Sequence, residues 1–291
     1  MKYLCHYTKS ETAKLIIKNM TLKFGKIKSS NDPIEIKKPY VVFSSTDEEE
    51  TNNTIEFQVK SYLNETLQFI CFSIGTIENI NCNILTYNKI RDFMDDEDTI
   101  EDAFLDELSK RPPYYLPRSW AQYGENNKGV CLIFNKDKLT KQIQKQTHLL
   151  YYLKHKKIKY IDILRSDLLS DLDFVFSDYE FLDEPHKNVK EVVNKTLKSK
   201  SDFIYFTKDI YWRDEREYRF LLWNMSENDN YENVFIKIDN ESLIGVVLGL
   251  YNEDCQLIKL AKEHSLNNIL KLKYDNFILS IENIEPVLKS V

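Results

Sequence analysis

Three stretches of the sequence contain more hydrogen-bonding and aromatic residues than packing requires. The first is His6, Tyr7 and Thr8, where a short strand is expected to end. Histidine offers one ring nitrogen as a donor and the other as an acceptor, which suits a ribose hydroxyl or a carboxamide. The polar turn that contains Asn31 follows two elements later. The plainer interpretation is an N-capping threonine and an ordinary turn.

The second cluster is the stretch 119–124, SWAQYG. Trp120 and Tyr123 are three residues apart, so they share one face of a helical turn. They either pack in the core or form a wall on which a flat ring stacks, a contact worth about 1 kcal/mol beyond the buried area. Gly129 opens a predicted strand over 130–134, and close approach of another backbone is a common reason for glycine there.

The third cluster is the charged block that begins at Lys208 and continues over 211–221. Along a strand, Glu215, Glu217 and Arg219 share one face while Tyr218 and the apolar residues after it share the other. We expect the apolar face to pack and the carboxylates to face outward. Two interpretations remain open. One is a solvated face of cross-paired charges, and the other is a carboxylate that stabilises a developing oxocarbenium ion, as in glycoside cleavage.

Other residues give weaker signals. His148 and His155 lie in a lysine-rich stretch with no third ligand at a useful spacing, so no metal site is expected. Cys71 lies in an apolar strand pattern, where cysteine is usually a small buried hydrophobe. The Glu-Ile-Lys at 35–37 resembles a nuclease element but lacks an aspartate on a preceding strand. The basic run over 136–159 either contacts phosphates or forms a charge-rich helix face.

The elements that must position these clusters follow from hydrophobic periodicity. The predicted strands are 2–7, 20–25, 40–43, 55–60, 69–74, 130–134, 157–164, 217–223, 233–239, 244–250, 269–274 and 277–283, and the predicted helices are 10–19, 95–110, 136–150, 174–201 and 252–265. No glycine- or serine-rich linker and no internal repeat interrupts them. We therefore expect one α+β domain over 1–291, with helical insertions at about 85–115 and 136–200 on a mixed or antiparallel sheet.

Composition narrows the function further. Only 6 of the 291 residues are glycine, and no glycine-rich phosphate loop is present. The net charge of −6 argues against binding to nucleic acid or membrane through bulk charge. The 5 cysteines are scattered without a CxxC motif, which favours a reducing compartment. No apolar run approaches the roughly 18 residues of a membrane span. We expect a soluble, cytoplasmic protein.

Five separated blocks together resemble one bacterial family. They are HYT at the start, the NDPxE turn, CFS on a strand, SWAxYGxxxxGVCLxF and a final K…W..E.EYR block. Their order and rough spacing resemble domain-of-unknown-function family twenty-nine seventy-one, from about Tyr3 to Ile284. Related proteins are met in phage-defence and abortive-infection settings.

The N-terminal layout also resembles the ADP-ribosyltransferases, in particular the DNA-modifying DarT-like toxins. Those open with a strand that ends in histidine and threonine, followed by a short helix and a second strand. The resemblance implies that His6 holds the ribose of NAD, that Ser73 or Tyr123 supports the nicotinamide pocket, and that a late-strand glutamate completes the site. Glu217 matches that glutamate, with Glu215 as the second acid of an ExE pair. The middle motif departs from the pattern, since it is CFS and not STS.

The expected function is therefore an ADP-ribosyltransferase-like enzyme that cleaves NAD, its substrate, and transfers ADP-ribose to a nucleic acid, a protein or water. Its expected role is that of a toxin or effector in phage defence. The expected catalytic residues are Glu217 and Glu215. The residues expected to bind NAD are His6, Tyr7, Thr8, Asn31, Ser73, Arg118, Trp120, Tyr123 and Arg219. Tyr7 or Trp120 would stack on nicotinamide, and Arg219 or Arg118 would neutralise the pyrophosphate. An antitoxin or a phage trigger is the implied partner. The alternatives are a non-catalytic sensor that binds a nucleotide or phage component, and a metal-dependent nuclease.

Overall fold

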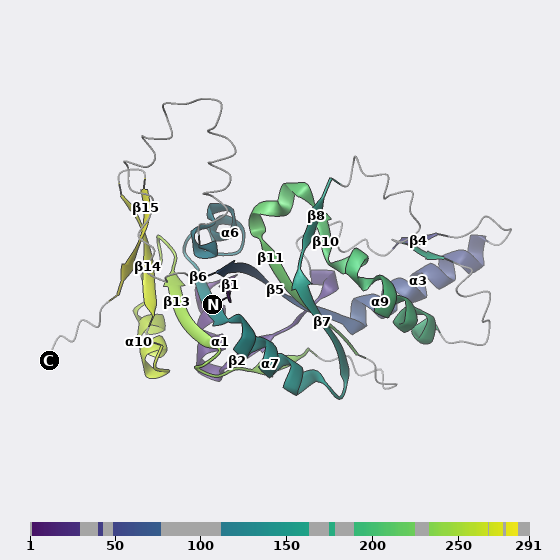
Figure 1. Ribbon diagram of the computed structural model, residues 1–291, viewed down its shortest axis with the longest axis horizontal. Coiled ribbons are helices and arrows are strands. Elements are labelled where there is room, and N and C mark those ends of the chain that lie inside the picture. The colour runs from purple at the N-terminus through teal and green to yellow at the C-terminus, as the bar shows by residue number, and fades with distance from the viewer. Residues whose placement is uncertain are drawn as a thin grey trace, which may run out of the picture. The chain divides into compact units, whose positions relative to one another are not determined.

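The fold is α+β, with helices and a large mixed sheet that does not close into a barrel. A computed structural model, drawn in Figure 1, describes residues 2–29, 40–42, 49–76, 112–162, 175–177, 189–224, 233–266, 268–275 and 278–284. The chain divides into two compact units that alternate along the sequence. Among the described residues, no helix combines the length and apolar composition that crossing a bilayer requires.

Unit 1 comprises Met1–Thr21, Phe72–Gln142 and Lys237–Val291. Its strands follow the order β15-β14-β13-β6-β1-β5, antiparallel except for the β13–β14 pair. The strands are β1 (Lys2–Thr8), β5 (Leu67–Thr76), β6 (Val130–Asn135), β13 (Leu243–Leu248), β14 (Ile269–Asp275) and β15 (Ile278–Asn283). The helices are α1 (Ser10–Asn19), α6 (Pro117–Gln122), α7 (Lys136–Thr147) and α10 (Cys255–Glu263). β5 and α7 begin in one unit and end in the other.

The core of unit 1 is rich in aromatic side chains. β1 is an inner strand of the sheet, paired on both edges, and its successive side chains alternate between the two faces of the sheet. One face contributes to a buried cluster with the loop that precedes β6. The members of this unit 1 cluster are Tyr3, Cys5, Tyr7, Tyr114, Tyr115, Trp120, Cys131, Ile133, Val247, Leu270 and Leu272.

Gly129 permits close packing at the start of β6, as its position predicts. A Cβ atom there would lie 2.8 Å from the carbonyl carbon of Gly124 and closer still to the carbonyl oxygen of Thr8. Both obstacles are backbone, so they cannot turn aside. We expect Gly129→Ala to lower the free energy of unfolding by about 1–3 kcal/mol, measured by denaturant titration. Lys128→Ala is the matched control because Lys128 is exposed. Equal stability of the two variants would contradict this account.

Unit 2 comprises Leu22–Cys71 and Ile143–Ile236. Here the strand order is β5-β11-β7, and β3 pairs with β5. The strands are β3 (Gly25–Lys26), β4 (Tyr40–Val42), β7 (Tyr151–Lys157), β8 (Lys159–Ile161), β9 (Val175–Ser177), β10 (Thr207–Asp209) and β11 (Glu217–Asn224). Two further parallel pairs are β10 with β8 and β4 with β9. The helices are α3 (Glu49–Thr66), α9 (Val189–Tyr205) and two 3-10 turns, η1 (Ile27–Ser29) and η5 (Ile210–Glu215). The short strands β2 (Thr21–Lys23) and β12 (Phe235–Lys237) pair with each other where the chain passes between the units.

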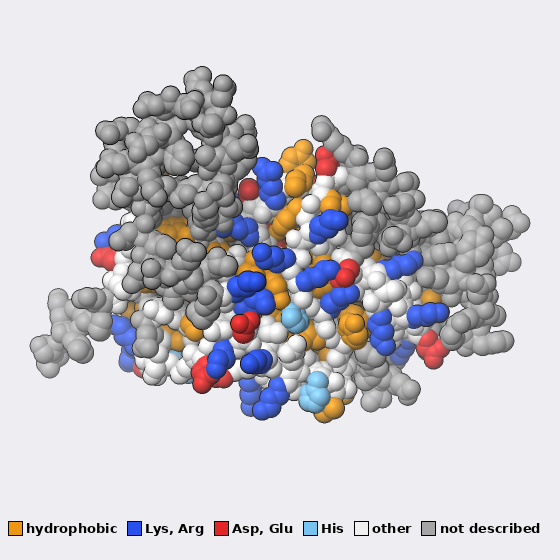
Figure 2. Space-filling model, in the orientation of Figure 1, with side chains coloured by type: hydrophobic (Ala, Val, Ile, Leu, Met, Phe, Trp, Pro, Cys, Tyr) orange, Lys and Arg blue, Asp and Glu red, His pale blue; other side chains and the backbone are white. Residues whose placement is uncertain are grey.

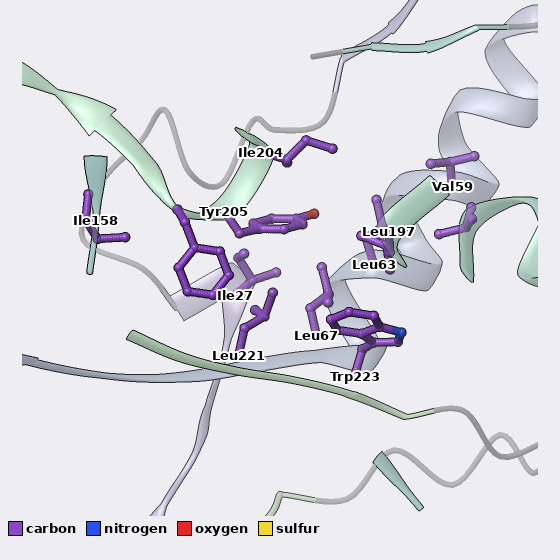
Figure 3. Packing of buried hydrophobic residues seen from close by; sticks show 12 residues of the cluster. Ile27, Val59, Leu63, Leu67, Ile158, Leu197, Ile204, Tyr205, Leu221 and Trp223 are labelled. Atoms are coloured by element: carbon purple, nitrogen blue, oxygen red, sulfur yellow. The ribbon is translucent and has the colours of Figure 1, made fainter. Parts of the chain in front are cut away.

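Helices α3 and α9 cover one face of β11 in unit 2. Figure 3 shows Val59 and Leu63 of α3 and Leu197 of α9 directed toward the same core as Leu221 and Trp223 of β11. All five are buried. This packing buries the face of β11 that also carries Glu217 and Arg219, since residues two apart on a strand share a face.

The structure corrects three element predictions. The predicted strand 55–60 is part of helix α3, because Val59, Tyr62 and Leu63 form a helical stripe on the core while Phe57 is 72% exposed. The strand predicted over 157–164 is preceded by β7, which the lysines in its sequence concealed. The range predicted as helix over 174–201 contains strand β9 before α9 begins.

The structure describes most of one of the two predicted helical insertions. The insertion at about 85–115, with helix 95–110, lies almost wholly outside the described residues. The insertion at 136–200 has helices at both ends but contains strands as well, and β7 pairs with β11. Helix α1 begins where predicted, although Lys9 and not Ser10 is its N-cap and no side chain caps it.

Candidate functional site

Four charged side chains meet in the interior of unit 2. They are Lys208 of β10, Glu215 of η5, and Glu217 and Arg219 of β11. Lys208 Nζ lies 3.0 Å from Glu215 Oε2 and 2.8 Å from Glu217 Oε2. Arg219 donates from Nε and Nη2 to Glu217 Oε1, each at 2.7 Å. We call these four residues the charge network. Each carboxylate oxygen of Glu217 therefore has its own cation.

A helix cap, a left-handed residue and a backbone hydrogen bond position the charge network. The carboxylate of Asp209 accepts a hydrogen bond from the Tyr211 N–H at 2.9 Å and so caps η5. Arg216, with φ of 47°, ends η5 in the left-handed conformation. The chain then enters β11 at Glu217, whose N–H donates to the Tyr160 hydroxyl at 2.8 Å. This turn folds Glu215 back toward Lys208.

The network is buried, which contradicts the prediction that the carboxylates face outward. Side-chain exposure is 6% for Lys208 and Glu215, 4% for Glu217 and 1% for Arg219. Every residue of β11 is buried, so neither face is solvated. The Arg219 guanidinium lies 5.1 Å from the Phe69 ring centroid and donates from Nη1 to the Tyr205 carbonyl at 2.8 Å.

The cations decide the charge state of Glu217. Burial alone raises the pKa of a carboxyl group because it penalises the charged form. The charges of Arg219 and Lys208, with hydrogen bonds from Arg219 and the Cys71 thiol, outweigh burial and lower the pKa of Glu217 to about 2. Burial raises the pKa of the neighbouring Tyr160 hydroxyl. At neutral pH the site therefore holds an ionised Glu217 beside a neutral phenol.

In unit 1, the strand register separates two of the predicted NAD-binding residues. Ser73 lies opposite Cys5 in the β1–β5 pair, so both side chains share one face of the sheet. His6 is on the other face, with its ring centroid 5.4 Å from that of Phe72. Thr8, two residues after His6, follows the same face. The structure thus brings His6 and Thr8 to one face and Ser73 to the opposite one.

The two aromatics predicted to stack on nicotinamide belong to the unit 1 cluster. The Trp120 side chain is fully buried, and its Nε1 donates to the Tyr114 carbonyl at 2.7 Å. The Tyr7 hydroxyl donates to the Pro113 carbonyl, and the Tyr7 ring meets the Trp120 ring edge-on at 5.1 Å. Burial raises the pKa of Tyr7. These contacts match the alternative interpretation of the block, in which its aromatics pack in the core.

The remaining predicted residues occupy different settings. Tyr123 ends α6 and is half-buried against the unit 1 cluster. Arg118 is exposed on α6, whereas the guanidinium of Arg219 is committed to the charge network. Of the two arginines predicted to neutralise a pyrophosphate, Arg118 is therefore the one that solvent reaches. Asn31 lies outside the described residues.

The loop between α6 and β6 is held in an unusual conformation. Residues 125–127 all have positive φ, between 51° and 67°, a backbone region that disfavours non-glycine residues. The Gly129 N–H donates to the Gly124 carbonyl at 2.8 Å. The amide of Asn252 donates to the Lys128 carbonyl at 2.7 Å. These bonds fix the loop beside the end of β1.

Sequence reasoning missed Lys208 and Tyr160 as members of the site. Lys208 is the first residue of the K…W..E.EYR block, and its place in that block was the available signal. Tyr160 had none, because it reaches Glu217 only through tertiary pairing, in which the Ile158 N–H donates to the Glu217 carbonyl at 3.0 Å. Cys71, set aside as a buried hydrophobe, instead contributes a hydrogen bond to Glu217. Within the described part of the chain, no group of three or more His, Cys, Asp or Glu residues is arranged to hold a metal ion.

Comparison with known proteins finds similarity to one family over part of the chain. No curated protein matched the chain, and no solved structure matched it. One family, described as protein of unknown function (DUF2971), matched over residues 119–220. The matched segment begins in the SWAQYG block and ends inside β11, so it includes Glu215, Glu217 and Arg219. Over these residues the protein carries the DUF2971 sequence pattern, in agreement with the resemblance of the two sequence blocks that lie in this segment.

Proposed function

We propose that the protein cleaves the nicotinamide N-glycosidic bond of NAD and transfers ADP-ribose to a macromolecule or to water. The observation that carries this proposal is Glu217, an ionised and rigidly held carboxylate at the first residue of β11. The resemblance to ADP-ribosyltransferases assigns the catalytic glutamate to this position. The β1–α1–β2 opening that the same resemblance requires is present in the fold.

The chemistry asks for a fixed negative charge. When the bond between the ribose C1′ and the nicotinamide nitrogen breaks, its electron pair leaves with nicotinamide, and positive charge develops on the ribose. A carboxylate that is already oriented stabilises that charge without reorganising. The acceptor oxygen or nitrogen then bonds to C1′ and releases its proton. In this scheme Glu217 also binds the ribose 2′-hydroxyl, Glu215 is the second acid, and Lys208 and Arg219 hold the carboxylate in position.

A specific observation favours a second candidate, a non-catalytic protein that binds a nucleotide. Both oxygens of Glu217 are already held by cations, and its side chain is 4% exposed. Buried ion pairs of this kind also occur with purely structural roles. In that case the protein would bind its ligand without turnover, and the charge of Glu217 would matter for folding alone.

The deciding experiment follows nicotinamide release from NAD by chromatography, with and without added nucleic acid or cell extract. We expect the wild-type protein to release nicotinamide and Glu217→Gln to be at least about 100-fold slower, the scale of one lost electrostatic contact. Leu63→Ala controls for stability, because removing this buried core residue costs about 2–5 kcal/mol. It should keep the rate per folded molecule.

Each result of this experiment separates the two candidates. No nicotinamide release by the wild-type protein under any of these conditions would refute the enzyme and leave the binding protein. Equal losses in Glu217→Gln and Leu63→Ala would show that the glutamate acts through folding. The predicted roles of His6, Thr8 and Arg118 can be tested in the same assay, and the predicted effector role in phage defence stays a prediction.

A further inference from the structure

Unit 2 carries a strip of lysines on its surface, although the whole chain has a net charge of −6. Lys154 and Lys156 of β7 each lie 2.8 Å from a carboxylate oxygen of Asp202 on α9. Lys195 and Lys198 are exposed on the same helix, seven and four residues before Asp202. That spacing places Lys195, Lys198 and Asp202 on one face of α9. Lys154, Lys156, Lys195 and Lys198 therefore form one strip that includes Asp202. We call it the lysine strip.

Further lysines lie near the lysine strip among the residues that the structure describes. Lys157 and Lys159 are exposed where β7 gives way to β8. Figure 2 shows Lys and Arg side chains outnumbering Asp and Glu over the part of the view where Figure 1 draws β7 and α9. The acidic residue Glu191 lies further along the same helical face. Such a field attracts a polyanion, and a phosphate backbone is one.

An exposed aromatic side chain lies in η5, which follows α9 and β10 in the chain. Tyr211 in η5 is 74% exposed, and the half-buried Trp212 ring lies 5.3 Å from Lys208 Nζ. Exposed Arg213 is next to them, with the exposed acid Asp214 beyond. Since an extended chain spans at most about 3.5 Å per residue, Tyr211 lies within about 30 Å of Asp202. An exposed aromatic beside a basic strip is the usual platform for an unpaired nucleobase.

From the lysine strip and Tyr211 we infer that unit 2 binds single-stranded nucleic acid. The lysines contact the phosphates, and the ring of Tyr211 stacks on a base. Base stacking requires an unpaired base, which favours single strands over duplexes. The inference goes beyond the proposed NAD chemistry and does not depend on it, because binding is measured without NAD.

The test is fluorescence anisotropy with labelled oligothymidylate of about 20 nucleotides, longer than the roughly 4–16 that one such surface occupies. We expect the double variant Lys195→Glu and Lys198→Glu to bind at least about 10-fold more weakly at about 50 mM salt. Its plot of log affinity against log salt should flatten by about 1.4, the value for two lost contacts to a single strand. Tyr211→Ala should lose about fivefold or more.

The matched control reverses two exposed lysines on a helix of unit 1, Lys259→Glu with Lys262→Glu. It should bind like the wild-type protein, and circular dichroism should show every variant folded. Three results would overturn the inference. They are no binding of the oligonucleotide at low salt, equal losses in the control, and duplex bound as tightly as single strand with no effect of Tyr211→Ala. Binding to acidic lipid vesicles in place of the oligonucleotide would also overturn it.

Discussion

Replacing Glu217 with glutamine is expected to lower the free energy of unfolding by about 3 kcal/mol. The glutamate neutralises Lys208 and Arg219, and all three side chains are less than a tenth exposed. Removing one partner of a buried ion pair leaves an uncompensated charge in the interior, which costs more than the pair itself contributes. For the outward-facing carboxylate predicted from the sequence, the same substitution would cost little, so the large expected loss follows from the burial of Glu217.

A double-mutant cycle isolates the interaction. Lys208→Met alone should also be destabilising, because Glu215 and Glu217 then face Arg219 alone. In the double variant with Glu217→Gln, one cation and one anion remain, so the loss should be smaller than the sum of the single losses by about 1 kcal/mol or more. The exposed pair Lys138 and Glu241 is the matched control, with an expected coupling of about 0.5 kcal/mol or less. Additive losses at Lys208 and Glu217 would contradict the network.

The same network should shape acid unfolding. The unfolded carboxyl takes up its proton near its ordinary pKa of 4.5, whereas folded Glu217 keeps its charge down to about 2. The stability it contributes is therefore present above pH 4.5 and is lost as the pH falls toward 2, because the unfolded state binds more protons in that window. The Glu217→Gln variant should lose less stability over that window than the wild-type protein. If the free energy of unfolding falls equally in the two proteins over this pH range, Glu217 does not have the lowered pKa.

Trp120→Ala is expected to lower the free energy of unfolding by about 3–5 kcal/mol. The indole is fully buried in the unit 1 cluster, and its removal leaves a cavity beside Tyr7. It also leaves the Tyr114 carbonyl without its indole donor. Trp120→Phe should recover much of the loss, because it keeps an aromatic ring but not the hydrogen bond. Denaturant titration of the two variants gives both values.

The Trp120 variants also bear on the predicted stacking of nicotinamide. If Trp120 only packs in the core, Trp120→Phe should leave the KM for NAD unchanged once the folded fraction is taken into account. A KM raised tenfold in a fully folded Trp120→Phe protein would restore the stacking role. Gln122→Ala, an exposed substitution on the same short helix, is the control and should change neither stability nor KM.

The spacing of apolar residues along the sequence and the residue types present predicted much of the fold. The strands β1, β5 and β6 were predicted because apolar β-forming residues run continuously through them, and such runs keep their conformation wherever both faces are covered. Helix α3 was not, because Ile55, Phe57 and Val59 alternate like a strand. Only the packing of Val59 and Leu63 against α9 selects the helix. The lysines of β7 similarly concealed a strand whose pairing with β11 supplies its stability.

The sequence by itself predicted which residues could carry chemistry and determined which of them share a face. Alternation placed Glu217 and Arg219 together, and the K…W..E.EYR block contained Lys208. Only the tertiary structure decided that this face is buried under α9 and β10, and that Tyr160 and Cys71 join it. The physical reason is that alternation fixes the direction of a side chain but not what covers it. Covering removes water, and without water the neighbouring cations and not the solvent set the charge of Glu217.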